Sequence, residues 1–150
     1  MTRTCTPLSL VERIAQIREA QAQQRLAEAM EREKAQRECV EQNSKRLSDT
    51  EQALHDLQSQ DILDLARLTL YRDMGTSIGF ALAGEQDTLL EKCKVRMARS
   101  DEQVHETNYR TRVSERLADI VRDAQRDLER RQSEELMEVW MLRGSLRGRS

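Results

Sequence analysis

The sequence predicts an all-α protein in which two long helices pair as an antiparallel coiled-coil hairpin. Three observations predict this fold. Charged residues make up 35% of the chain and hydrophobic residues only 37%, against about 25% and 45–50% in ordinary globular domains. Glycine and proline are scarce, five and one among 150 residues, so little interrupts a helix. Apolar residues recur at steps of three and four, which is the spacing of one helix face.

The first helix is expected over about residues 8–72. Pro7, the only proline, suits the first position of a helix, because its missing N–H has no helical partner there. No glycine or proline follows before residue 73, and so long a run is typical of a coiled coil. The apolar stripe along this helix begins with Leu10, Ile14 and Ile17. The stripe weakens where Glu33 and Arg37 take seam positions.

A glycine-containing turn is expected at residues 73–79, within a glycine-rich stretch that extends to residue 84. Gly75, Gly79 and Gly84 cluster there, and Gly84 is either a second hinge or a glycine tolerated inside a helix. The second helix then covers about residues 80–143, followed by a basic tail at 144–150. The two arms are nearly equal in length. They therefore favour a register centred near Thr76, which pairs Ile14 with Val139.

No catalytic, cofactor-binding or metal-binding residue is expected. The two histidines, His55 and His105, are not spaced as a ligand pair, and a zinc site needs at least three such ligands close together. The glycines are not followed by the Lys-Ser/Thr of a phosphate-binding loop. A helical rod also offers no enclosed pocket for a nucleophile. The chain is therefore predicted not to be an enzyme.

Composition also bounds the compartment and the kinds of partner. Three widely spaced cysteines fit a reducing compartment. The chain shows no secretory signal peptide and no uninterrupted apolar run long enough to span a membrane. The net charge of −2, with both signs interleaved, favours no nucleic acid partner. A cytoplasmic protein without membrane insertion is expected.

Two places along the chain are candidates for binding another protein. The first is the expected turn tip, which carries Ile78, Phe80 and Leu82. These residues either contact a partner or close the coiled coil by packing on preceding leucines. The second is the end at which both termini are expected to meet. There Trp140 is either an anchor for a partner or part of a thicker hairpin core.

Two stretches of the chain resemble a known family. The stretch PLSLVERIAQIREAQAQQRLAEAM (residues 7–30) and the charged stretch RRQSEELMEVWMLRG (residues 130–144) resemble the stalk proteins of type III export systems, the FliJ/YscO family. The resemblance implies an antiparallel coiled coil similar to the gamma subunit of rotary ATP synthases. It also implies that the end carrying both termini sits in the pore of the hexameric export ATPase. The remainder then reaches toward the membrane export gate, and some members bind substrate chaperones.

The resemblance assigns partners to the two candidate places. The ring end comprises Ile14, Ile17, Arg18, Val139, Trp140 and Arg143. The gate-facing tip comprises Ile78, Phe80 and Leu82. The expected function is a non-enzymatic stalk or adaptor, cytoplasmic or peripheral at the inner membrane within a secretion complex. The alternative is a generic cytoplasmic coiled-coil scaffold that homodimerises and has no role in secretion.

Overall fold

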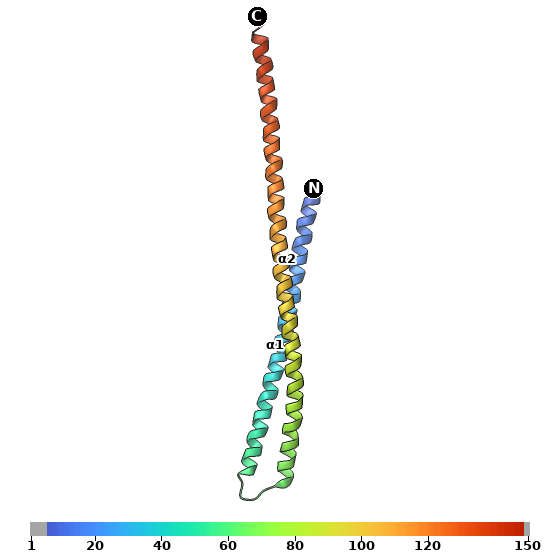
Figure 1. Ribbon diagram of the computed structural model, residues 1–150, viewed down its shortest axis with the longest axis vertical. Coiled ribbons are helices and arrows are strands. Elements are labelled where there is room, and N and C mark those ends of the chain that lie inside the picture. The colour runs from blue at the N-terminus through green and yellow to red at the C-terminus, as the bar shows by residue number, and fades with distance from the viewer. Residues whose placement is uncertain (1–5, 149–150) are drawn as a thin grey trace, which may run out of the picture. The chain divides into compact units, whose positions relative to one another are not determined.

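The computed structural model describes residues 6–148, which form two long helices. Helix α1 spans Pro7–Gln58 (52 residues) and helix α2 spans Leu65–Arg147 (83 residues) (Figure 1). The all-α prediction is confirmed, because every element among the described residues is helical. The chain divides into two units. We call the described parts of Met1–Glu19 and Glu106–Ser150 the terminal unit, and Ala20–His105 the loop unit.

In the loop unit the two helices lie side by side and run antiparallel (Figure 1). The Nη1 atom of Arg25 lies 2.6 Å from Oε1 of Glu102, and the amide of Asn43 donates to a carboxylate oxygen of Glu85 at 2.5 Å. Residues later in α1 therefore contact residues earlier in α2, as antiparallel pairing requires.

The seam of α1 follows two interleaved seven-residue repeats, which is the spacing of a coiled coil. The positions of these two repeats are all buried or half-buried: Glu12, Ala15, Glu19, Ala22, Leu26, Ala29, Glu33, Gln36, Val40, Asn43, Leu47, Thr50, Leu54 and Leu57. Cys39 and Ala53, each next to a seam position, are half-buried as well. Alanines take three successive places of one repeat and are at most 6% exposed. Because an alanine side chain is a single methyl group, the helices can approach closely at these places. Leucines fill the seam nearer the connection, where Leu57 and Leu82 are 8% and 9% exposed.

The connection between the helices lies at residues 59–64, so the predicted turn at 73–79 is wrong. The first helix ends at Gln58, not near residue 72, and the second begins at Leu65, not at 80. Asp64 starts α2 as its N-cap: its Oδ1 accepts a hydrogen bond from the backbone N–H of Arg67 at 3.2 Å. The connection contains neither glycine nor proline: Ser59, Gln60 and Asp61 begin it, and Ile62 and Leu63 precede the cap.

The glycine cluster lies inside α2. None of the described glycines has a positive φ, so none needs the conformational freedom of a turn. A Cβ atom added at Gly79 or Gly84 would meet nothing within 4 Å, and one at Gly75 would meet only Cγ2 of Thr50 at 3.8 Å. Of the two readings of Gly84, the structure has the glycine within a helix.

Alanine at these glycines should stabilise the protein. We expect Gly79→Ala and Gly84→Ala each to raise the free energy of unfolding by about 0.5–1 kcal/mol, because glycine is the poorer helix former and the added methyl meets no atom. Thermal or urea unfolding followed by circular dichroism measures the change. A loss of stability in either variant would instead place a turn at these residues.

The predicted register is also wrong. The pairs Arg25–Glu102, Gln36–Lys92 and Asn43–Glu85 are all centred close to the 59–64 connection, not near Thr76. In the terminal unit the same holds: Glu19 contacts Arg110 at 2.5 Å, so Ile14 does not face Val139. Because the true turn lies earlier in the sequence, α2 is the longer helix by 31 residues.

Candidate protein-docking surface

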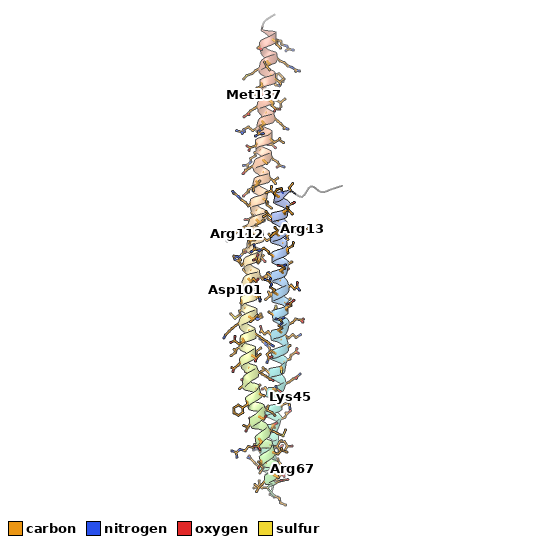
Figure 2. The ribbon with its side chains drawn as sticks, turned by 90° about the vertical axis from the view of Figure 1, so that its right-hand side faces the viewer. Arg13, Lys45, Arg67, Asp101, Arg112 and Met137 are labelled. Carbon is orange, nitrogen blue, oxygen red and sulfur yellow. The ribbon has the colours of Figure 1, made fainter. Side chains whose placement is uncertain are left out.

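Within residues 6–148, no helix packs on the last part of α2. In the terminal unit, α1 begins at Pro7 and its first seam position is Glu12, while α2 continues to Arg147. Every residue from 118 to 148 is exposed. Figure 2 shows the same feature: Arg13 lies beside the part of α2 that carries Arg112, and Met137 projects from the part beyond the start of α1. We call residues 120–147 the α2 extension.

The α2 extension carries an apolar stripe that is open to solvent. Its members are Val121 (50% exposed), Leu128 (57%), Val139 (47%), Leu142 (64%) and Leu146 (73%). Their spacings are sums of three- and four-residue steps, so they share one face of the helix. Trp140 flanks this stripe and is 75% exposed, whereas Met141, 69% exposed, lies toward the opposite side of the helix. Exposed apolar residues gathered on one face of a helix indicate a site of protein–protein contact.

Three ion pairs support the helix of the extension from its other side. Asp119 contacts Arg122, Asp123 contacts Arg126 at 4.0 Å and Asp127 contacts Arg130 at 3.8 Å. Pairs of this spacing each stabilise a helix by about 0.2–0.5 kcal/mol. They favour a helical extension even before a partner covers the stripe.

The start of α1 adds a second exposed apolar patch to the terminal unit. Leu10, Ile14 and Ile17 are 45%, 55% and 49% exposed. The prediction that they form the seam is wrong, because Glu12, Ala15 and Glu19 occupy the seam positions instead. These three residues do share one face of α1, but that face points away from α2.

The structure does not bring the six predicted ring-end residues together. Ile14, Ile17 and Arg18 lie where α1 is paired, and Arg18 contacts Glu106 of α2. Val139, Trp140 and Arg143 lie more than 30 residues further along α2 than Glu106, a separation of roughly 50 Å at 1.5 Å per residue. The expectation that both termini meet at one end therefore fails within the terminal unit.

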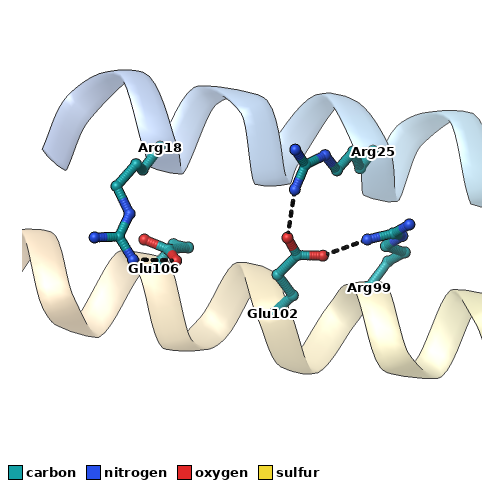
Figure 3. A network of polar contacts seen from close by, with 5 residues as sticks. All are labelled: Arg18, Arg25, Arg99, Glu102 and Glu106. Atoms are coloured by element: carbon teal, nitrogen blue, oxygen red, sulfur yellow. Dashed lines mark hydrogen bonds and ion pairs between the residues drawn. The ribbon is translucent and has the colours of Figure 1, made fainter. Parts of the chain in front are cut away.

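Arg18 is held against α2 rather than presented to a partner. Its guanidinium donates to Glu106 Oε1 at 2.9 Å (Figure 3). The same guanidinium lies 4.8 Å from the centre of the Tyr109 ring. Arginine over an aromatic face gains a cation–π attraction in addition to the ion pair. The position predicted to bind a ring thus has a structural role in fixing the terminal unit.

Polar pairs take the place of hydrophobic layers in much of the seam. In the terminal unit, Glu19 is 7% exposed and accepts hydrogen bonds from Arg110 at 2.5 Å and Thr107 at 3.1 Å. The hydrogen bond from Arg110 holds the pKa of Glu19 below its ordinary value of 4.5. The favourable charge contact outweighs the loss of water around this carboxylate.

The loop unit repeats this arrangement twice. Glu33, 6% exposed, is paired with Arg96 across the seam and with Arg37 on its own helix at 2.7 Å. Burial raises its pKa, but hydrogen bonds from Arg96 and Cys93 and the charges of both arginines bring it below 4.5. Glu102 lies between Arg99 and Arg25, at 2.8 and 2.6 Å, and both lower its pKa (Figure 3).

These three glutamates make the free energy of unfolding depend on pH, with less stability in acid. Each has a folded-state pKa below its ordinary value of 4.5, so its contribution is fully present above 4.5 and is lost as the pH falls through the folded pKa. We expect the melting temperature to drop on acidification below 4.5. The triple variant Glu19→Gln, Glu33→Gln, Glu102→Gln should melt lower at neutral pH and lose less on acidification.

The matched control is Glu31→Gln, Glu38→Gln, Glu41→Gln, which removes three exposed carboxylates. We expect it to keep the melting temperature and acid sensitivity of the original chain. Differential scanning calorimetry over a pH series measures both quantities. An equal acid-dependent loss in the Glu19, Glu33 and Glu102 variant and in the original chain would contradict the assignment.

The residues predicted to form the turn tip lie within α2 in the loop unit. Leu82 is buried, Ile78 is half-buried in the seam and Phe80 is 78% exposed on the side of the helix. The actual connection presents Ile62 (84% exposed), Leu63 and Leu65. These three residues lie just before and after the cap Asp64, and that cap is the sequence signal that locates them.

Two of the three cysteines lie among the described residues. Cys39 and Cys93 are free thiols, and Cys5 lies outside the described residues. Burial and then Glu85 raise the pKa of the Cys39 thiol, which favours its protonated form. No group of three or more metal-ligating side chains is found in residues 6–148, and no helix there has the length and apolarity to cross a membrane.

Comparison of the chain with models of known protein families, with curated proteins and with solved structures finds no match.

Proposed function

We propose that this chain is a non-enzymatic helical adaptor that binds another protein through the α2 extension. The observation that supports this most strongly is the exposure of its apolar stripe together with Trp140, on a helical segment that no other described part of the chain covers. Burying such a stripe against another protein would remove apolar area from water, which is the main favourable term in association. Trp140 has the size and the position for an anchor residue.

In the specific form of this proposal, the chain is an antiparallel coiled-coil stalk of a type III export apparatus. The 28 residues of the extension make a helix about 42 Å long at 1.5 Å per residue, and a single helix of that length suits insertion into the central pore of a hexameric ATPase. The partner class comes from the resemblance of residues 7–30 and 130–144 to that family. The connection with Ile62, Leu63 and Leu65 is then the candidate contact for the export gate or for substrate chaperones.

Two measurements test this proposal. The first is binding of this chain to the purified cognate export ATPase, and the second is the rate of ATP hydrolysis by that ATPase with and without the chain. We expect binding by the original chain and loss of binding in the triple variant Leu128→Lys, Val139→Lys, Leu142→Lys. The matched control is Leu90→Lys, Met97→Lys, Val104→Lys, which charges three exposed apolar residues of α2 in the loop unit. If the original chain neither binds nor changes the rate, the export-stalk assignment is wrong.

A further inference from the structure

We propose that, when no other protein covers it, the α2 extension pairs antiparallel with the α2 extension of a second copy of this chain. This inference goes beyond the adaptor function, because it assigns the same surface a second, self-complementary occupant. It rests on the length of the extension, the order of its apolar residues and the order of its charges.

The length of the extension is sufficient for a stable pair. Its 28 residues amount to four heptads, and coiled-coil pairing needs about three to four. In the register proposed here, residue 120 of one copy lies beside residue 147 of the other. Each extension then begins where its own α1 starts, near Pro7, and ends at the last helical residue, Arg147. The second copy therefore fills the space along α2 that α1 leaves open.

The same register places the apolar stripe of one copy against the apolar stripe of the other. It places Val121 opposite Leu146 and Leu128 opposite Val139 of the second copy, and each pair occurs twice because of the two-fold symmetry. Leu142 falls opposite Gln125, so this layer is mixed. All of the larger residues in these layers are at least 47% exposed in the single chain. Two layers of large side chains on each side of the symmetry axis bury much of the stripe.

The middle of the stripe is polar, and its groups are also complementary. Gln132 comes opposite Glu135 of the second copy, so the side-chain amide can donate to the carboxylate on both sides of the axis. A polar layer of this kind costs stability but fixes the register of a coiled coil.

Charges at the edge of the stripe support the same pairing. Arg131 of one copy falls between Glu134 and Glu138 of the other. In the described chain none of these three residues makes an ion pair, whereas Asp119–Arg122, Asp123–Arg126 and Asp127–Arg130 are paired on the opposite side of the helix. The extension carries equal numbers of acidic and basic residues, so no net repulsion opposes the approach of two copies.

Disulfide trapping tests the orientation and the register together. In full-length chains with Cys5, Cys39 and Cys93 replaced by serine, a mixture of Leu128→Cys and Val139→Cys proteins should form a mixed disulfide dimer. Leu128→Cys alone should not, because residue 128 of the two copies is then offset by roughly 16 Å along the helix, beyond the reach of a disulfide. Efficient cross-linking of Leu128→Cys to itself would indicate a parallel pair and would overturn the proposal.

Sedimentation equilibrium of the full chain tests the charge pairing. We expect a dimer whose dissociation constant rises about tenfold or more in Glu134→Arg, Glu138→Arg and is restored when Arg131→Glu is added. Asp119→Arg, Asp123→Arg changes the net charge equally on the other side of the helix and should leave the dimer intact. A monomer at every accessible concentration overturns self-pairing alone, since the adaptor proposal is tested separately by binding to the ATPase.

Discussion

Replacing Leu82 by alanine should lower the free energy of unfolding by about 2–3 kcal/mol, the largest stability change expected from truncating a single side chain. Leu82 is 9% exposed in the seam of the loop unit, so truncation removes buried methyl groups and leaves a cavity between the helices. The value lies at the lower end of the usual range because a two-helix seam can close around the gap. Urea unfolding followed by circular dichroism measures it.

Phe80→Ala is the control for this prediction. Phe80 lies two residues away on the same helix but is 78% exposed, and surface substitutions usually change stability by about 0.5 kcal/mol or less. If Phe80→Ala cost more stability than Leu82→Ala, the assignment of the seam would be wrong. The pair also tests the observed position of these two residues inside α2 against the predicted turn tip.

Replacing Trp140 by alanine should weaken partner binding about 30-fold or more while leaving the fold intact. Trp140 is 75% exposed beside the stripe of the α2 extension, and anchor residues of this type lose about 2 kcal/mol or more on truncation, which corresponds to that factor. Isothermal titration with the cognate export ATPase measures the affinity, and thermal melting checks the fold.

Phe80→Ala again supplies the control, since it removes an equally exposed aromatic ring from α2 in the loop unit. We expect its affinity to equal that of the original chain. If the two variants bound equally well, or lost equal affinity, the extension would not be the anchor of the docking surface.

The helical class could be predicted from composition, but the position of the turn could not be predicted from glycine. Helical glycines cost about 1 kcal/mol each relative to alanine, and the 83-residue helix α2 tolerates four of them, three in the central cluster. The real connection contains neither glycine nor proline and is marked by the cap Asp64. Giving that aspartate more weight than the glycines would have placed the turn correctly and shown that α2 is the longer helix.

The seam was missed because it uses small and charged residues. The sequence predicts a seam of large apolar residues, namely Leu10, Ile14 and Ile17. The buried repeat at seven-residue spacing is instead formed by alanines, at Ala15, Ala22 and Ala29. The buried carboxylates Glu19 and Glu33 are paired across the seam with Arg110 and Arg96 of α2, and those partners follow from the register. The wrong position of the turn therefore also gave a wrong seam and a wrong set of ring-end residues. Trp140 could still be named from the sequence as a candidate partner contact, because it is the only tryptophan.

The most direct test of the unpaired α2 extension is the distance between spin labels at residues 14 and 140, both in the terminal unit. The labels are attached at Ile14→Cys and Trp140→Cys with Cys5, Cys39 and Cys93 replaced by serine. The labelled chain is diluted with unlabelled chain, and the distance is measured by pulsed electron–electron double resonance. Ile14 lies opposite α2 near Val113, so a separation of about 40 Å is expected at 1.5 Å per residue. A separation near the 8–10 Å spacing of packed helices would mean that α1 covers the extension, and would contradict the account.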